Sequence, residues 1–198
     1  MKQIIGLTGP SGAGKSAALK EIDRHRFAVI DCDVLARRAV EKGSLCLRRL
    51  CEIFGDQILC PDGSLNRAKL AEIAFSDPQK MRQLNDTVFP AVLTLILDEI
   101  AASKSDIVIL DAPTLIQSGL AEICSPVISV LADRSLRLQR IMQRDSLTRQ
   151  QAESRLDAAL PDEEYRQASD YVLYNNTTQK EFAACFANLF NEITEESK

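Results

Sequence analysis

The sequence contains a single histidine, His25, and no two of its six cysteines have the Cys-x-x-Cys spacing of a zinc or redox motif. These absences exclude the familiar zinc sites that combine cysteine and histidine ligands. A chain of 198 residues can bury a hydrophobic core of its own and needs no disulfide or metal for stability. We therefore interpret the cysteines as reduced thiols that mostly fill the core.

Long apolar runs and an excess of basic residues are missing as well. No run approaches the roughly 18 apolar residues of a membrane-spanning helix. The 28 acidic side chains outnumber the 24 basic ones, and the resulting formal charge of −4 argues against broad electrostatic binding of nucleic acid. The first residues lead directly into a predicted strand and leave no room for a leader peptide. We expect a cytoplasmic protein without membrane or nucleic-acid partners, of an oligomeric state that the sequence leaves open.

Five short, apolar, β-branched segments predict the strands of one sheet. Most of them lack the alternation of a half-exposed strand, as expected for parallel strands that are buried on both faces. Helical patterns between them indicate βαβ crossovers and an α/β three-layer sandwich. The predicted strands are Gln3–Thr8, Phe27–Asp31, Ile107–Asp111, Val127–Ala132 and Asp170–Tyr174, and the predicted helices are Lys15–His25, Asp33–Lys42, Leu136–Arg144 and Gln179–Glu195.

Two helical insertions interrupt this alternation. Residues 44–103 separate the second and third strands and contain about three helical segments, with a turn at Pro61-Asp62-Gly63-Ser64. A crossover needs only about a dozen residues, so the extra helices are expected to form a small lobe beside the sheet. A charged second insertion precedes the last strand. We predict one domain over residues 1–198, with a helical acceptor-binding insertion at about 44–103 and a lid at about 145–168.

The segment Gly9-Pro10-Ser11-Gly12-Ala13-Gly14-Lys15-Ser16, called the phosphate loop below, fits G-x-x-x-x-G-K-[ST] at every fixed position. It stands between a predicted strand and a predicted helix, as the motif requires. The glycines let backbone N–H groups turn toward a phosphate, and the start of the helix adds positive potential. Lys15 supplies a cation for the β- and γ-phosphates, and Ser16 supplies a hydroxyl ligand for Mg²⁺. The loop therefore predicts a nucleoside triphosphate site.

Other features narrow the class of nucleotide-binding protein. The D-x-x-G switch and the N-K-x-D base reader of GTPases are both absent. The chain is short for a motor ATPase, and seven arginines without a lysine follow the fourth strand, from Arg134 to Arg166. Together with the helical insertion, these features are more typical of a small-molecule kinase.

Three of these arginines, Arg137, Arg140 and Arg144, are spaced i, i+3 and i+7 and so share one helix face. Arginine is well suited to bidentate phosphate contacts, so this face is predicted to meet the triphosphate while the lid closes and excludes water. The alternative interpretation is a solvated face whose arginines pair with nearby carboxylates.

Aspartates follow the ends of the second and third predicted strands, the edge where open α/β sheets bind ligands. Asp33 is the predicted general base for the acceptor hydroxyl, because the only histidine lies in a polar helical segment. Asp33 could also be the N-cap of the next helix, a role compatible with catalysis. Asp111 closes an apolar run and resembles a Walker B carboxylate. Whether Asp31 or Asp111 contacts Mg²⁺ stays open at this level.

The order of these motifs resembles that of the dephospho-CoA kinase family, the last enzyme of coenzyme A synthesis, along nearly the whole chain. The phosphate loop alone is shared by many families, whereas residues 62–75 read together with residues 31–37 are much more specific. The matching segments are Ile5–Ser16, Val29–Asp33 with Ala36-Arg37, Phe54-Gly55, Asp62–Arg67 with Leu70-Ala71 and Phe75, Leu110–Leu115, Arg140–Arg144, Ala168–Val172 and Asn175.

The resemblance implies ATP-dependent phosphorylation of the ribose 3′-hydroxyl of dephospho-CoA, with Mg²⁺, and a P-loop kinase fold with sheet order 2-3-1-4-5. It implies that Asp33 is the base and that Arg140 contacts phosphates from the lid. We assign Asp33, Lys15 and Arg140 to catalysis. We assign Gly12, Ala13, Gly14, Lys15, Ser16, Ala17, Arg144 and Asn175 to ATP, Thr8, Asp33, Arg67 and Asp111 to the acceptor, and Ser16 to the metal.

Three positions depart from the family pattern. Phe89 replaces a histidine before Pro90, Gln117 replaces a glutamate, and Ala159 replaces a glutamine of the lid helix. The first two fall where the acceptor could bind, so the exact acceptor stays open. A nucleoside or nucleoside-monophosphate kinase is the alternative enzyme, because the same phosphate-loop spelling occurs in guanylate-type kinases. A nucleotide-binding regulatory protein without transfer activity is the alternative outside enzymes.

Overall fold

The computed structural model describes residues 2–195 and divides them into two compact units. The second unit spans Asp31–Ala102, and the described residues on either side of it in the sequence form the first. Within residues 2–195, no helix combines the length and the apolar character needed to cross a membrane.

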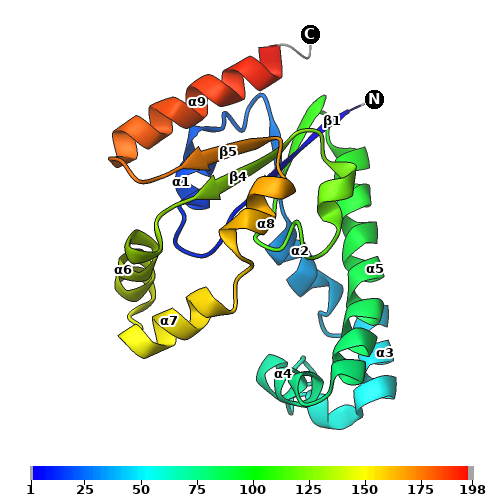
Figure 1. Ribbon diagram of the computed structural model, residues 1–198. Helices are drawn as coiled ribbons and strands as arrows, with labels where there is room; N and C mark the ends of the chain where they lie inside the picture. Colours follow the sequence, from blue (N-terminus) through cyan, green and yellow to red (C-terminus); the bar gives the residue numbers. More distant parts are fainter. Residues whose placement is uncertain (1, 196–198) are drawn as a thin grey trace. The chain divides into compact units, whose positions relative to one another are not determined.

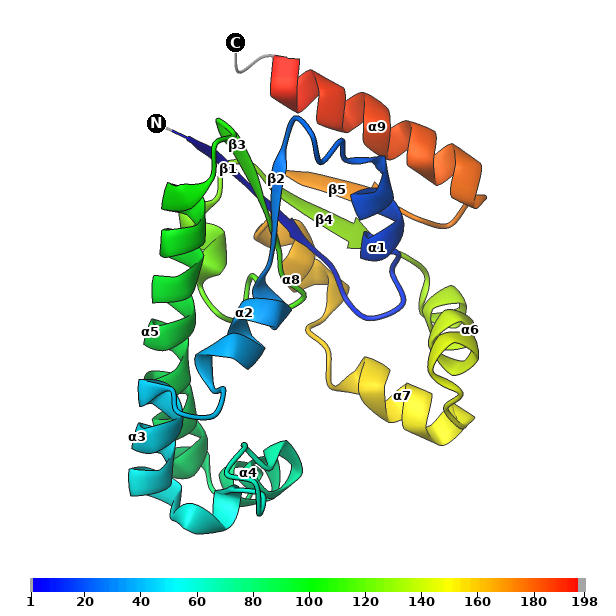
Figure 2. The same cartoon turned by 180° about the vertical axis from the view of Figure 1, so that it is seen from behind.

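Five strands in the order β2-β3-β1-β4-β5 form one sheet (Figure 1 and Figure 2). The pairings of β1 with β3 and β4, and of β4 with β5, are parallel, and Gln3 lies opposite Ile107. The predicted fold class and strand order are confirmed, and the strand bounds agree with prediction to within one residue. The strands are β1 (Gln3–Thr8), β2 (Ala28–Asp31), β3 (Ile107–Asp111), β4 (Val127–Leu131) and β5 (Tyr171–Tyr174).

The helix after the first strand is shorter than the predicted segment, residues 15–25. It ends at Glu21, and Ile22 is already extended. The Asp23 carboxylate accepts a hydrogen bond from the N–H of His25, and its carbonyl accepts from Arg26 and Phe27. A local turn therefore uses the groups that would continue the helix. The helices of the first unit are α1 (Lys15–Ala18), η1 (Leu19–Glu21), η3 (Leu120–Ile123), α6 (Arg134–Asp145), α7 (Arg149–Asp157), α8 (Asp162–Gln167) and α9 (Gln179–Glu195).

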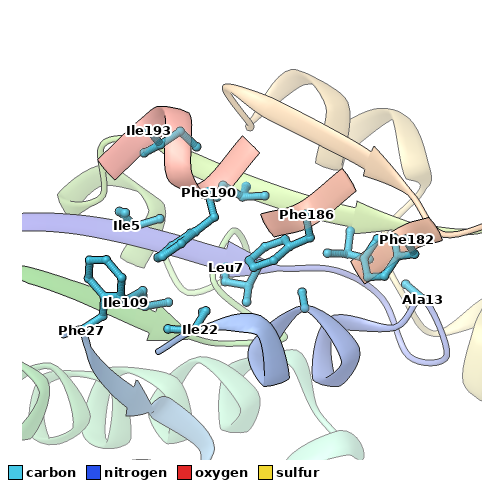
Figure 3. Close-up of a cluster of buried hydrophobic side chains, with 13 residues drawn as sticks. Ile5, Leu7, Ala13, Ile22, Phe27, Ile109, Phe182, Phe186, Phe190 and Ile193 are labelled. Atoms are coloured by element: carbon cyan, nitrogen blue, oxygen red, sulfur yellow. The ribbon is translucent and has the colours of Figure 1, made fainter. Parts of the chain in front are cut away.

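The helix α9 covers one face of the sheet with phenylalanines at four-residue spacing (Figure 3). Phe182, Phe186 and Phe190 are at most 3% exposed. The Phe190 ring stacks on Phe186 at 5.6 Å between centroids and meets Phe27 edge-on at 5.1 Å. Each buried ring contributes about 1.5–3 kcal/mol of transfer free energy. Ala13 of the phosphate loop belongs to the same cluster, so the loop also packs against this core.

The second unit is helical, and α5 (Pro78–Ala102) contacts each of the other α-helices (Figure 2). Its core includes Leu50, Phe54 and Ile58. The predicted turn is present, because the Asp62 carboxylate accepts from the N–H and the hydroxyl of Ser64, at 2.9 and 2.7 Å. The remaining helices are α2 (Cys32–Ala39), α3 (Leu45–Phe54), η2 (Asp56–Ile58) and α4 (Arg67–Phe75).

The cysteines are less buried than the sequence suggested. All six are free thiols, but only Cys32 and Cys46 are buried, and Cys185 is exposed. Cys185 lies on α9 between residues of the buried phenylalanine stripe, and helical periodicity turns it away from the sheet. Burial raises the pKa of Cys124 to about 12, so its thiol stays protonated at neutral pH.

Candidate active site

The phosphate loop leaves β1 at Thr8, and its backbone demands glycine at two points. Gly9 has φ 147°, and a Cβ there would lie 2.2 Å from the carbonyl oxygen of Val130. Gly14 has φ 110° and is the N-cap of α1. A Cβ at Gly14 would lie 1.9 Å from Nδ2 of Asn175. A side chain at either position would push the loop away from the sheet.

Asn175 ties the loop to the end of β5. Asn175 is only 6% exposed, and its Nδ2 donates to the carbonyl of Ala13 at 2.9 Å. Its own N–H donates to the carbonyl of Leu131 at 2.8 Å, which fixes it beside β4. Arg140 donates to the Asn175 carbonyl at 3.0 Å and to the carbonyl of Gly12 at 3.3 Å. One asparagine and one arginine therefore brace consecutive peptides of the loop.

All three arginines predicted to share a face of α6 reach the phosphate loop. Arg137 donates to the Ser11 carbonyl at 3.4 Å, and Nη2 of Arg144 lies 3.5 Å from the Ser11 hydroxyl. Arg144 also pairs with Asp145 at 2.7 Å, and this hydrogen bond lowers the pKa of Asp145. Arg137 pairs with a carboxylate as well, that of Asp162, but its side chain is only 5% exposed, so the solvated face of the alternative interpretation does not describe it.

The Lys15 ammonium forms an ion pair with the Asp111 carboxylate at the end of β3. The two side chains are only 15% and 11% exposed, so the pair is shielded from bulk water. Thr8 is buried, and its hydroxyl donates to the carbonyl of Pro113 at 3.3 Å, two residues after Asp111. Ser16 is exposed at the start of α1. The structure therefore brings Thr8, Lys15 and Asp111 together at the carboxyl edge of the sheet.

The helix α2 begins earlier than predicted, which changes the roles of two aspartates. Asp31 is its N-cap, with the carboxylate accepting from the N–H of Val34 at 3.0 Å. The capping interpretation of Asp33 is wrong. Asp33 lies in the first turn of α2 and is exposed. Among the described residues, its carboxylate has no hydrogen-bond or ion-pair partner, so it is free for an external hydroxyl.

Comparison with known proteins adds to this geometry. The family model described as dephospho-CoA kinase matches residues 3–181, which include the phosphate loop, both aspartates and Asn175. The chain belongs to the dephospho-CoA kinase family. A dephospho-CoA kinase of Staphylococcus saprophyticus is 32% identical over 194 residues, which cover 97% of this chain and 94% of the relative.

Solved structures agree with the fold of this family. The structure of TT1252 from Thermus thermophilus is 30% identical, with a TM-score of 0.84 over 96% of this chain and 97% of that one. A dephospho-CoA kinase from Campylobacter jejuni has a TM-score of 0.73 over 100% of both chains. At 24% identity, the latter likeness shows the fold alone.

The remaining predicted positions of this dephospho-CoA kinase family member lie in two places. Arg67 is the exposed first residue of α4 and, like Asp33, belongs to the second unit, whereas the other predicted site residues lie in the first. Phe89 is half-buried in α5, and Ala159 is half-buried after α7. Gln117 is exposed and hydrogen-bonded to Tyr165. The binding roles of these residues stay predictions.

Sequence reasoning missed two residues that the structure connects to the site. Asp162, at the start of α8, forms an ion pair with Arg137 at 2.8 Å. Tyr165, one turn later, is 1% exposed. No local signal could have found the ion pair, because its partners are 25 positions apart and the whole of α7 lies between them in the sequence.

The structure sharpens a prediction for Arg140. Its guanidinium donates to the loop from one side and to Asn175 from the other. A lysine ammonium cannot span both. We expect Arg140→Lys to lower kcat/KM for ATP about tenfold or more, equivalent to about 1.4 kcal/mol. Steady-state kinetics measure this effect. The matched control is Arg134→Lys on the same helix, where the side chain is 57% exposed. Equal values for the two variants would contradict a role of the fork.

Proposed function

We propose that this kinase transfers the γ-phosphoryl group of ATP to the ribose 3′-hydroxyl of dephospho-CoA and releases CoA and ADP. The observation that carries the proposal is the family match over residues 3–181, which spans both units of the chain. The phosphate loop and the residues braced around it support the ATP half of the reaction.

The residues of the first unit would bind and orient ATP. Backbone N–H groups of the phosphate loop and the Lys15 ammonium hold the phosphates, and Arg140 and Arg144 add positive charge from α6. The ion pair with Asp111 already positions the Lys15 ammonium, so the ammonium would need little rearrangement when the phosphates of ATP bind. We place the lid at residues 145–168, where α7 packs on α6 through Ile141, Ala152 and Leu156. Its closure would exclude water that competes with the acceptor.

Magnesium fits this site as a companion of ATP. Within residues 2–195 there is no group of three or more His, Cys, Asp or Glu side chains that could hold a metal. Mg²⁺ usually binds through one or two protein oxygens and the substrate phosphates, so a complete protein cage is not required. The Ser16 hydroxyl, with Asp31 or Asp111, would supply those oxygens. The ion would neutralise charge on the transferred phosphoryl group.

The acceptor side is assigned to Thr8, Asp33, Arg67 and Asp111. Because β1 and β2 belong to one parallel sheet, their carboxyl ends lie at the same edge, where α/β proteins bind ligands. Asp33 follows β2 by two residues and would accept the proton of the 3′-hydroxyl. The ribose oxygen then bonds to the γ-phosphorus, and the bond from that phosphorus to the β–γ bridging oxygen breaks.

The deciding experiment measures ADP release with different acceptors. We expect turnover with ATP, Mg²⁺ and dephospho-CoA, and a product that carries one additional phosphoryl group by mass spectrometry. A dephospho-CoA analogue with 3′-deoxyribose is the matched control and should give no acceptor-dependent ADP. Omission of Mg²⁺ with a chelator present should abolish turnover.

Other outcomes would overturn the proposal in distinct ways. Faster ADP release with a nucleoside or nucleoside monophosphate than with dephospho-CoA would make the protein a nucleoside-type kinase. Tight ATP binding without turnover on any acceptor would indicate a regulatory protein. Phosphorylation of the 3′-deoxy analogue would show that the transfer goes to another group of the acceptor.

A further inference from the structure

An arginine on α6 is buried between the phosphate loop and α8. The Arg137 side chain is 5% exposed, whereas Arg134 on the same helix is 57% exposed. Its Nε donates to the Ser11 carbonyl at 3.4 Å, and its Nη1 donates to the Asp162 carboxylate at 2.8 Å. A buried charge needs such a partner, so Asp162 determines where this guanidinium lies.

The partner of Arg137 is itself held in place. Asp162 is the first residue of α8, and Tyr165 on the same helix is 1% exposed. The Tyr165 hydroxyl hydrogen-bonds the side chain of Gln117, in the segment that follows β3. Burial raises the pKa of Tyr165, so the phenol stays neutral and can keep this bond. The segment after β3, α8 and α6 are thereby connected to one another.

The Ser11 carbonyl matters because of peptide geometry. In a trans peptide, the C=O of one residue and the N–H of the next point in opposite directions. A donor that holds the Ser11 carbonyl toward α6 therefore turns the Gly12 N–H to the opposite side of the loop. Gly12 has φ 80°, and glycine changes between positive and negative φ easily. The orientation of this peptide therefore depends on a hydrogen bond from outside the loop.

We propose that Arg137 and Asp162 are positioning residues of the nucleotide site. Their ion pair holds the peptide between Ser11 and Gly12 in the orientation that presents the Gly12 N–H to a phosphate. Neither residue needs to touch the nucleotide. The inference extends the ATP half of the proposed function and is independent of the acceptor.

The experiment measures the Kd for ADP by titration calorimetry, without acceptor, well below the melting temperature of each variant. We expect Arg137→Met to raise the Kd about tenfold and Asp162→Asn to raise it about threefold to fivefold. The double variant should be no worse than Arg137→Met alone, because both changes remove one interaction. Arg137→Lys should recover part of the affinity, because a lysine can still reach one of the two acceptors.

The matched control is Arg134→Met. Arg134 also leaves α6 in an ion pair, with Asp157 at 2.7 Å, but it has no contact with the phosphate loop among the described residues. We expect its Kd for ADP to stay within twofold of the wild type, whatever its effect on the melting temperature. A drop in melting temperature without a change in Kd for Arg137→Met would reduce the pair to a structural role and overturn the proposal.

Two further results bear on the same point. Additive effects of the single substitutions would contradict a shared interaction. If Arg137→Met does not fold, an unchanged Kd in Asp162→Asn overturns the proposal, since the Asp162 side chain is 34% exposed and asparagine is nearly isosteric with it, so this variant is expected to fold. Failure of dephospho-CoA as acceptor, with the expected changes in Kd for ADP, would refute the proposed function and leave this inference intact.

Discussion

Substitution of Asp33 by asparagine is expected to lower kcat about 10²–10⁴-fold, the usual contribution of a general base, while the Kd for ATP stays nearly unchanged. The change is near-isosteric and removes the proton acceptor. Folding should survive, because Asp31 and not Asp33 caps α2. Single-turnover kinetics with dephospho-CoA and calorimetry with ATP measure the two quantities separately.

Asp31→Asn is the matched control for this experiment. Asparagine also caps helices well, so α2 should keep its start, and kcat should remain within a fewfold of the wild type if Asp33 is the base and Asp111, not Asp31, is the magnesium ligand. The opposite result, with activity lost in Asp31→Asn and kept in Asp33→Asn, would assign the proton transfer to Asp31. A large rise in the Kd for ATP in Asp33→Asn would instead place this carboxylate in nucleotide or metal binding.

Replacement of Lys15 by alanine is expected to lower kcat about 30-fold to 900-fold. Within the motif, Lys15 is the side chain placed at the β- and γ-phosphates, and loss of one such charged contact costs about 2–4 kcal/mol of transition-state stabilisation. The structure adds a second effect. Asp111, whose side chain is 11% exposed, loses its ion pair with Lys15, which is expected to lower the stability of the fold.

Kinetics of three variants separate these effects. Lys20→Ala, in the exposed turn η1, is the matched control and should keep wild-type kcat. Lys15→Ala with Asp111→Asn removes both charges and should recover stability but not transfer. Retention of more than about a tenth of wild-type kcat by Lys15→Ala would exclude this lysine from the mechanism, because a tenfold loss corresponds to only 1.4 kcal/mol.

The sheet and the phosphate loop were accessible from the sequence because their signals are local. A strand buried on both faces is a continuous apolar run, and Val127–Leu131 is buried at every position. The phosphate loop needs glycine where φ is positive, at Gly9 and Gly14, and both are fixed positions of the motif. The shared face of Arg137, Arg140 and Arg144 also follows from helical spacing alone. Strand order and acceptor required the family resemblance, because pairing between distant strands has no local signal.

Local patterns failed where short-range hydrogen bonds compete with periodicity. The turn at Asp23 ended the predicted helix early, and the cap at Asp31 moved the start of α2 two residues earlier than the capping interpretation placed it. Apolar composition also overestimated the burial of the cysteines, since a thiol such as Cys185 is small enough to lie on an exposed helix face.

The sequence by itself therefore determined the sheet, the phosphate loop and the arginine face, because each depends on neighbours within a few positions. Only the tertiary structure decided what these side chains contact. The pairing of Lys15 with Asp111 and of Arg137 with Asp162 joins segments 96 and 25 positions apart. A charge that is buried loses its contact with water. It is stable in the fold only where the tertiary structure brings a group of opposite charge to it from another part of the chain.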